Sequence, residues 1–518
     1  MKSAIARLAP LAGAFALAGL AHAQATQQPK YPALPSETPA EFTAPTAGFN
    51  YTKRSVMVPM RDGTKLNTII IVPKGAKNAP ILLTRTPYDA SSLTSHAESS
   101  DLGSILQGYD NAADVIVEGD YIRVVQDVRG KYGSEGDYVM NRPLQGPLNP
   151  TPVDHSTDTY DTIEWLVKNI PETNGKVGII GISYDGFLPL MALVNPHPAL
   201  KAAVPMNPMV DGWKGDDWFH NGAFRQINMS YMLEQVVTRR NDAKWFTSHY
   251  DDYDMYVRAG SAGELGRQRG LEQSGFWKKV LAHPSYDSFW QQQAMDKILA
   301  KQPVTVPTLL VHSLWDAEDI YGPIAVYKAI KPNDKDNKVF LTIGPWSHGG
   351  AIGEGSSLGA IKFGHDTALH WRQEVLKPFL ARHLKDDMSA PQVPTVTAFE
   401  TGTNKWRNLS AWPAGCVSGC AIKPVPLRLT GNHVASFSAP PYAKGYDEYI
   451  SDPAKPVPFR QRPIPPYGYD EAKGQSWPRW LVDDQREASG RTDVLTFTTD
   501  VLTVPVKISG EPIANLVA

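Results

Sequence analysis

Residues 176–186, KVGIIGISYDG, constrain the fold of this chain more than any other segment. The short apolar run at 177–180 is typical of a buried strand in a parallel sheet. A glycine-flanked turn centred on Ser183 follows, and residues 187–193 then have the composition of a helix. The pattern predicts a nucleophile elbow, a tight strand-to-helix turn that exposes a serine hydroxyl above the sheet.

The predicted elbow departs from the general pattern at one position. A glycine is usual two residues after the serine, but this chain has Asp185 there, and Gly186 comes one residue later. The alternative is that Ser183 only caps the helix that follows. Other parts of the chain are therefore needed to choose between the two interpretations.

Short apolar segments on both sides of the elbow alternate with helical patterns. Strands are predicted at residues 80–85, 121–126, 202–206, 308–312 and 338–343, and helices at 102–118 and 158–169. This alternation predicts an α/β fold with a mainly parallel sheet. Residues 54–72 read as a hairpin around a turn at 61–64, so the sheet should have an antiparallel start.

Two regions interrupt the alternation. Residues 211–300 have helical runs at 226–237 and 290–300 and many aromatic residues, which predicts a helical cap over the site. The alternative is that these are further helices of the main layer. Residues 391–518 carry short strands among proline- and glycine-rich turns, at 395–399, 425–429, 494–498 and 504–508, which predicts a sandwich or jelly roll. The main domain would then comprise residues 49–210 and 301–390.

The N-terminal segment has the features of a secretory signal. Lys2 and Arg7 precede an apolar run at 8–20, and residues 21–23 (AHA) fit a cleavage site. We therefore expect a signal peptide at 1–23, an extended arm at 24–48 and a periplasmic or secreted product. No other segment resembles a membrane span. The net charge of −2 gives no support for a nucleic-acid or anionic-membrane partner.

The chain has only two cysteines, Cys416 and Cys420. Two cysteines without a nearby histidine make a poor zinc site, and in an oxidising compartment a local disulfide is expected instead. The sequence predicts no metal and no cofactor.

A serine nucleophile requires a base, and the base requires an acid that orients it. Asp316 and His348 each follow a predicted strand, and the chain order of serine, acid and histidine fits this architecture. The sequence therefore predicts the triad Ser183, Asp316 and His348. One oxyanion donor should be the backbone N–H of Tyr184, and the loop at 85–89 should supply a second, for which the Tyr88 hydroxyl is a candidate. The alternative is that Tyr88 is a packed loop residue.

More carboxylates surround the predicted triad than it needs. Glu318 and Asp319 follow Asp316 closely, and Asp216 and Asp217 lie at the start of the predicted cap. Like charges at one strand end repel unless a cation joins them, so the cluster predicts a site for a substrate ammonium. The alternative is that Asp319 caps a helix at 320–330 and that Glu318 is solvated.

Several segments together resemble the α-amino acid ester hydrolases, which belong to a wider group with cocaine esterase and the X-Pro dipeptidyl peptidases. They are GISYDG, LWDAEDIYG, GPWSHGG, VVQDVRGKYGSEG and MVDGWKGDDWFHNGAFR. The resemblance covers the chain from about residue 49 onward. It implies an α/β-hydrolase domain, a helical cap, a C-terminal jelly roll and a periplasmic homotetramer. In that family the jelly roll continues past the segment matching residues 509–518, so this chain is expected to end within the module.

The resemblance also implies roles for individual residues. The family's triad corresponds to Ser183, Asp316 and His348, and its oxyanion donors to the Tyr184 backbone and the Tyr88 hydroxyl. Its carboxylate cluster, which binds the substrate α-ammonium, corresponds to Asp217, Glu318 and Asp319. Such enzymes hydrolyse α-amino acid esters and amides through a seryl acyl-enzyme, and they can transfer the acyl group to β-lactam nuclei.

Three other functions remain open on the sequence alone. A general carboxylesterase or acylase of the same fold would need no α-amino group on its substrate. A peptidase that cuts after proline would use the same triad. A non-catalytic protein that binds a surface through the β module would need no reactive serine.

Overall fold

The computed structural model describes residues 36–215, 217–414, 416, 420–438, 445–465 and 477–516. The chain divides into two units, Met1–Ala47 and Gly48–Ala518. In the first unit the described residues, 36–47, are exposed and form neither helix nor strand. All further description concerns the second unit.

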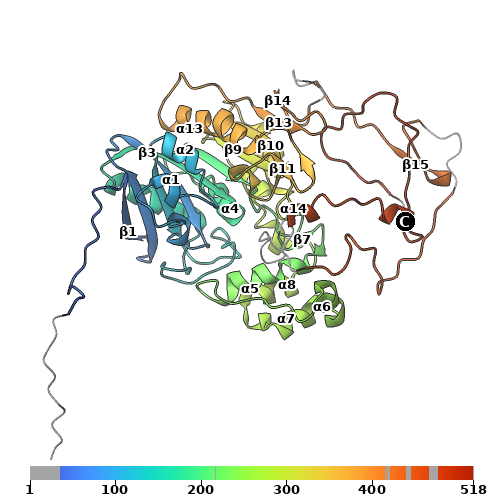
Figure 1. The fold of residues 1–518 in the computed structure, drawn as a ribbon, viewed down its shortest axis with the longest axis horizontal. Helices are drawn as coiled ribbons and strands as arrows, with labels where there is room; N and C mark the ends of the chain where they lie inside the picture. Colours follow the sequence, from blue (N-terminus) through green and yellow to red (C-terminus); the bar gives the residue numbers. More distant parts are fainter. Residues whose placement is uncertain are drawn as a thin grey trace, which may run out of the picture. The chain divides into compact units, whose positions relative to one another are not determined.

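A ten-stranded sheet organises the second unit (Figure 1). Its spatial order is β1-β2-β4-β3-β5-β6-β9-β10-β13-β14. The strands from β4 to β13 in this order pair in parallel, and β1–β2, β2–β4 and β13–β14 pair antiparallel. The predicted α/β fold with an antiparallel start is therefore confirmed. The strands are β1 (Tyr51–Pro59), β2 (Lys65–Pro73), β3 (Ala79–Thr86), β4 (Ile122–Asp127), β5 (Thr173–Ile182), β6 (Leu200–Met206), β9 (Thr308–Trp315), β10 (Val339–Ser347), β13 (Val396–Glu400) and β14 (Lys405–Leu409).

Helices cover both faces of the sheet, which explains why the central strands are apolar throughout. All residues of β3 and β4 are buried. Successive strand residues enter two separate cores: Ile81 and Leu83 pack in one, and Leu82 packs in the other. α3 (His155–Asn169), α4 (Tyr184–Ala192) and α11 (Gly322–Ile330) contribute to the first core, and α2 (Ala113–Glu118) and α13 (Lys377–Leu384) to the second.

The chain between β6 and β9 is an insertion made mainly of helices, here called the cap, and its role as a cover over the site stays a prediction. Its apolar side chains, Trp277 among them, join the first core. The predicted helix at 290–300 is interrupted, because the Met295 N–H donates a hydrogen bond to the Val210 carbonyl at 2.9 Å. The elements are β7 (Phe219–His220), β8 (Ala223–Phe224), α5 (Met229–Val237), α6 (Asp252–Ala259), α7 (Ala262–Gln268), α8 (Gly275–Ala282), α9 (Ser288–Gln291) and α10 (Met295–Leu299).

The helix predicted over residues 102–118 was wrong in its length. The structure has two short helices, α1 (Leu102–Ile105) and α2, separated by a turn. Gly108 and Asp110 lie in that turn with φ of 110° and 63°. An α-helix cannot pass through residues with positive φ, so the chain breaks there.

The C-terminal region differs in detail from the prediction. The strand expected at 395–399 exists, but as β13 it pairs with β10 and so belongs to the main sheet. Beyond it, the described residues contain one further strand pair, β15 (Arg428–Thr430) with β16 (Val434–Ser436). The segments 494–498 and 504–508 are not strands, and Val504 and Ile508 are exposed. The jelly-roll domain itself therefore remains a prediction.

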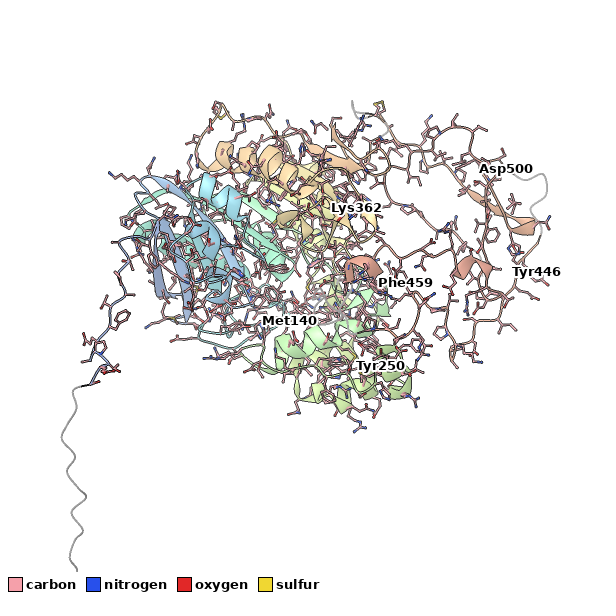
Figure 2. The ribbon with its side chains drawn as sticks, viewed as in Figure 1. Met140, Tyr250, Lys362, Tyr446, Phe459 and Asp500 are labelled. Atoms are coloured by element: carbon pink, nitrogen blue, oxygen red, sulfur yellow. A yellow bond between two sulfur atoms is a disulfide. The ribbon has the colours of Figure 1, made fainter. Side chains whose placement is uncertain are left out.

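Four further features concern the cysteines, membrane spans, metal ligands and surface side chains of the described residues. Cys416 and Cys420 form a disulfide. No helix of the described residues is long and apolar enough to cross a membrane. Within the same residues, no group of three His, Cys, Asp or Glu side chains is placed to hold a metal ion. Large exposed side chains such as Tyr250 and Tyr446 project from the surface (Figure 2).

Candidate active site

Ser183 occupies a sharp turn between β5 and α4. Its φ of 63° is in the left-handed region, which is uncommon for a residue with a side chain. The Ser183 N–H donates to the Met206 carbonyl at 3.0 Å, and the Ser183 carbonyl accepts from the N–H groups of Gly186 and Phe187. The side chain makes no capping hydrogen bond to α4. The geometry is that of a nucleophile elbow, and the capping alternative is wrong.

The structure explains why Asp185 is tolerated where glycine is usual. A Cβ atom on Gly186 would lie 2.5 Å from the Met206 carbonyl oxygen. A Cβ atom on Gly181 would lie 2.2 Å from the Asp185 carbonyl oxygen. The close backbone approaches in this elbow therefore fall at positions 181 and 186, and position 185 has room for a side chain.

Asp316 and His348 lie at the carboxyl ends of β9 and β10. The His348 Nδ1 atom is 3.0 Å from both carboxylate oxygens of Asp316. Asp316 Oδ1 also accepts hydrogen bonds from the N–H groups of Glu318 and Asp319, at 2.8 and 2.9 Å. Burial opposes ionisation of Asp316, but the charge and the hydrogen bond of His348 outweigh it, and the net pKa is lowered. Asp316 is thus a fixed anion that orients the imidazole.

Several contacts bring the His348 loop to the elbow. The Gly349 N–H donates to Asn207 Oδ1 at 3.3 Å. Asn207 directly follows Met206, whose carbonyl accepts from the Ser183 N–H. A Cβ atom on Gly349 would lie 3.4 Å from Ile182. Within the described residues His348 Nε2 has no hydrogen-bond partner. This ring nitrogen is therefore available to a nucleophile or a substrate.

The predicted carboxylates gather around this histidine. Glu318 Oε2 is 4.0 Å from His348 Nε2, and Asp319 Oδ2 is 4.0 Å from His348 Nδ1. Asp319 is fully buried, and the Glu318 side chain is 13% exposed. α11 begins at Gly322 without a side-chain cap. The alternative of a capping Asp319 and a solvated Glu318 is therefore wrong.

Asp217 completes the cluster from the cap. It is buried, and Asn228 Nδ2 donates to its Oδ1 at 2.8 Å. Burial and the charge of Glu318 raise the pKa of Asp217 to about 7, although Arg225 opposes this. Asp216 lies outside the described residues. Asn228 and Arg225 had not been predicted to take part, because an amide and an arginine in a cap segment carry no distinctive sequence signal.

The carboxylate cluster controls the charge of His348. Burial lowers the pKa of His348, but the negative charges of Asp316 and Glu318 outweigh burial and raise it to about 10. The surrounding carboxylates therefore favour the protonated form of the imidazole.

Tyr88 and Tyr184 are the two residues predicted to donate to the oxyanion, and these roles stay predictions. Tyr88 is in the loop after β3, and its hydroxyl is 2.9 Å from the Tyr231 hydroxyl of α5. Burial raises the pKa of Tyr88 well above its usual value, so its hydroxyl keeps its proton. Tyr184 begins α4, and its N–H has no acceptor among the described residues. The sequence did not single out Tyr231, because it lies in an ordinary helical pattern.

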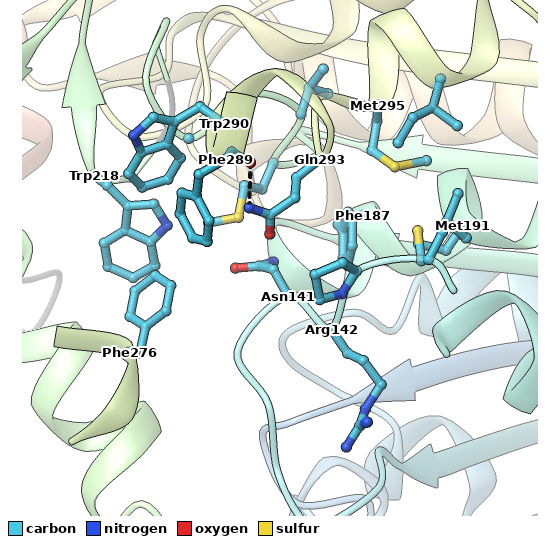
Figure 3. A pocket seen from close by; sticks show the side chains of 16 residues that line it. Asn141, Arg142, Phe187, Met191, Trp218, Phe276, Phe289, Trp290, Gln293 and Met295 are labelled. Carbon is cyan, nitrogen blue, oxygen red and sulfur yellow. Dashed lines mark hydrogen bonds between the residues drawn. The ribbon is translucent and has the colours of Figure 1, made fainter. Parts of the chain in front are cut away.

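A mainly apolar pocket lies between α4 and the cap (Figure 3). Its empty space is about 540 Å³, including the open mouth. Trp218 lines it directly after Asp217 and stacks on Tyr231 with ring centroids 5.9 Å apart. The Asn141 amide also lines it, and the Asn141 N–H donates to the Tyr184 hydroxyl at 3.0 Å. The remaining walls include Phe187, Met191, Phe276 and Trp290.

The chain is similar to several known hydrolases. Residues 62–350 match the X-Pro dipeptidyl-peptidase (S15) family. A cocaine esterase from Rhodococcus sp. (strain MB1 Bresler) is 28% identical, over 90% of this chain and 78% of that protein. A putative serine esterase of Mycobacterium bovis is 23% identical, over 89% of this chain and 75% of that protein.

Two solved structures are more similar. An α-amino acid ester hydrolase is 52% identical with a TM-score of 0.86, covering 93% of this chain and 77% of that one. An aminopeptidase from a marine sediment Thaumarchaeota archaeon is 51% identical with a TM-score of 0.83, covering 89% of this chain and 74% of that one.

The fold and these relatives define a serine ester hydrolase of the α/β-hydrolase class. Within that class, the chain belongs to the X-Pro dipeptidyl-peptidase (S15) family.

Proposed function

We propose that this enzyme hydrolyses esters and amides of α-amino acids through a seryl acyl-enzyme. His348 removes the proton of Ser183 as the hydroxyl attacks the substrate carbonyl, and then protonates the leaving group. Asp316 holds the imidazole in place. The Tyr184 N–H and the Tyr88 hydroxyl donate to the developing oxyanion. Water, or an amine such as a β-lactam nucleus, then attacks the acyl-enzyme and frees Ser183.

The observation that carries this proposal is the carboxylate cluster beside the catalytic imidazole. Glu318 and Asp319 each have a carboxylate oxygen 4.0 Å from a ring nitrogen of His348, and Asp217 lies close enough to affect the same pKa. A cation bound there would be next to the reacting carbonyl. This favours an ammonium on the α-carbon of the acyl group. The pocket lined by Trp218 would take an apolar side chain on the same carbon.

The test compares kcat/KM for a phenylglycine ester with kcat/KM for the matching phenylacetate ester, because the two differ only in the α-amino group. A preference of about a hundredfold for the amino ester, equal to roughly 2.7 kcal/mol of transition-state binding, is the expected result. No preference would leave a general carboxylesterase. The Ser183→Ala variant should lose activity on both esters.

Aminopeptidase activity is a second candidate, because the 51% identical structure is described as an aminopeptidase. The same cluster could hold the N-terminal ammonium of a peptide. The amides of phenylglycine and of single amino acids, and an X-Pro dipeptide amide, distinguish these activities. A dipeptidyl peptidase would need its ammonium site one residue further from Ser183. The proximity of Glu318 to His348 therefore favours single-residue substrates.

A fluorophosphonate probe separates all of these enzymes from a non-catalytic binding protein. Labelling of Ser183 in the folded chain is expected, and its absence would contradict a reactive serine.

We also propose export with cleavage after residue 23 and assembly as a homotetramer. N-terminal sequencing of the secreted product and light scattering test these two points.

A further inference from the structure

One lysine side chain, that of Lys131, is fully buried between the loop after β4 and the cap. Its ammonium donates hydrogen bonds to three acceptors, which are the carbonyls of Gln235 and Thr238 and the Oδ1 atom of Asn241. It also lies 4.4 Å from the centroid of the Tyr138 ring. Lysine is seldom fully buried, and these neutral acceptors and the aromatic face replace much of the water that the charge loses.

The number of acceptors matches the ammonium form of Lys131. Burial, followed by the charge of Arg239, disfavours this form and lowers the pKa of the lysine to about 7. A neutral amine has only two N–H groups, however, so only the ammonium satisfies all three acceptors. The Gln235 carbonyl belongs to the last turn of α5, where carbonyls lack partners within the helix. The charge therefore binds the end of α5 to the main domain.

The contact with Asn241 leads to the main chain beside Tyr88. Asn241 Nδ2 donates to the Pro87 carbonyl at 3.0 Å, and Pro87 directly precedes Tyr88. An ammonium can only donate and a carbonyl can only accept, so these two partners fix the orientation of the amide. Asn241 has a φ of 53°, in the left-handed region that asparagine tolerates better than most residues. The segment after α5 thus joins the ammonium to the Tyr88 loop.

The contact with Gln235 leads to the Tyr88 hydroxyl. Gln235 lies four residues after Tyr231, so the two are neighbours on one face of α5. The Tyr231 hydroxyl is 2.9 Å from the Tyr88 hydroxyl. The two connections therefore start at one ammonium and end at the backbone and at the side chain of the same tyrosine.

We propose that Lys131 is a positioning residue, which places the Tyr88 hydroxyl for the oxyanion by holding α5 and the Tyr88 loop together. It acts through Asn241 and α5 and takes no part in the chemistry itself. This inference rests on the proposed function, and within it on the role of Tyr88 as an oxyanion donor. The alternative is that Lys131 only stabilises the packing of the cap.

A double-mutant cycle of Lys131→Met and Tyr88→Phe separates these two roles. Methionine keeps the length of the side chain and removes the ammonium. In the wild-type background, Lys131→Met should lower kcat for the phenylglycine ester about 10- to 100-fold with little change in KM, because a displaced oxyanion donor weakens transition-state binding. In the Tyr88→Phe background the same change should cost less than about twofold. Equal losses in the two backgrounds would overturn the proposal.

Asn241→Asp keeps the proposal testable if Lys131→Met does not fold. The aspartate retains an acceptor for the ammonium but replaces the donor to the Pro87 carbonyl with a second oxygen. The variant should keep its Tm, because the new charge pairs with Lys131. Its kcat should fall about tenfold, because the contact with the Tyr88 loop is lost. A wild-type kcat in this variant would contradict the proposed connection.

Lys385→Met is the matched control. Lys385 directly follows α13, and its ammonium lies 4.9 Å from the centroid of the Tyr121 ring, so it also combines a helix end with an aromatic face. Tyr121 and α13 belong to the second core. This variant should keep the kcat and KM of the wild type. A loss equal to that in Lys131→Met would contradict a specific role for Lys131.

Labelling of wild-type Ser183 by the fluorophosphonate probe separates this inference from the proposed function. Labelling together with unequal losses in the two backgrounds is the expected result. Failure of the wild type to label would contradict the proposed function. Normal labelling with equal losses in the two backgrounds would contradict only the role of Lys131.

Discussion

His348 shows how one residue's environment can link binding to chemistry. Its pKa is raised to about 10 because Asp316 and Glu318 place negative charge beside it, which favours the protonated imidazole. A cation placed among Glu318, Asp319 and Asp217 would offset the charges that raise this pKa. A substrate ammonium would then both anchor the substrate and release the imidazole to act as a base. The preference for substrates with an α-amino group would therefore appear in kcat as well as in the affinity for the substrate.

The substitution Glu318→Gln should have opposite effects on two substrates. It removes one of the charges that raise the pKa of His348, and a fall of one unit makes about tenfold more neutral imidazole at pH 7. The kcat/KM for a neutral phenylacetate ester should therefore rise by up to about tenfold. The kcat/KM for the phenylglycine ester should fall by about tenfold or more, because an ammonium partner is lost.

The pH profiles of the same variant provide the check. The acidic limb of kcat/KM for the neutral ester should move to lower pH in Glu318→Gln, because activity requires the deprotonated histidine. Glu354→Gln, an exposed change in the loop after His348, should leave both profiles unchanged. A decrease on both esters without a shift of the limb would argue against this control of His348.

Removal of the Tyr88 hydroxyl tests the oxyanion site. Tyr88→Phe should lower kcat about 100- to 1,000-fold and change KM little, because the donor acts on charge that develops only in the transition state. Tyr231→Phe removes only the hydroxyl that contacts Tyr88, and we expect a smaller loss. Similar small losses in both variants would indicate that Tyr88 is a packed loop residue.

At the scale of elements, the elbow depends on the close contact between α4 and β6. In Gly186→Ala the new methyl group would meet the Met206 carbonyl at 2.5 Å and the Pro208 Cα at 3.2 Å. Backbone atoms cannot move aside as a side chain can, so we expect a loss of about 1–3 kcal/mol in the free energy of unfolding and a large fall in kcat. Thermal unfolding and esterase assays measure the two effects.

Gly275→Ala is the matched control for this change. Gly275 begins α8, and a Cβ atom there would meet nothing within 4 Å. This variant should keep wild-type activity and stability, or become slightly more stable, because alanine favours helix. Equal tolerance at the two positions would show that the elbow is less constrained than its contacts indicate.

The sequence predicted those elements whose signal is local. The strand ending at Ile182, and the order of Ser183, Asp316 and His348, follow from apolar runs and turn residues. The break at Asp110 did not, because the sequence alone did not show that Gly108 and Asp110 adopt positive φ. The place of β13 was also beyond local reasoning, because a strand's pattern does not identify its neighbour.

The same distinction between local and long-range features applies to the candidate site. Acidic residues close together in the sequence, such as Glu318 and Asp319, indicate a cluster by their spacing alone. The contributions of Asn228 and Tyr231 depend on how the cap folds back, so no spacing in the sequence reveals them.

At the scale of the whole molecule, Arg462 and Ile464 contact the cap. Arg462 Nε donates to Asp251 Oδ2 at 2.6 Å, and its guanidinium lies 4.4 Å from the Tyr253 ring centroid. The Asp252 N–H donates to the Ile464 carbonyl at 3.0 Å. These contacts hold the beginning of α6 against the C-terminal region.

Loss of this attachment should be visible by limited proteolysis. Arg462→Ala should accelerate thermolysin cleavage within residues 445–465 roughly threefold or more, because local opening becomes easier. Arg486→Ala is a suitable control, since Arg486 is exposed and pairs with neighbouring Asp484. Unchanged cleavage in Arg462→Ala would show that the main-chain contacts suffice.

The insertion between β6 and β9 separates two strands that nevertheless pair, with Met206 opposite Val311. The entropy of closing so long a loop changes slowly with its length, by about 0.6 kcal/mol for each halving or doubling. The length of the cap therefore has little effect on the free energy of forming the sheet that carries Ser183 and His348. Natural variation could remodel the segment that bears Asp217 and Trp218, and with it the choice of substrate, while the reaction chemistry stays unchanged.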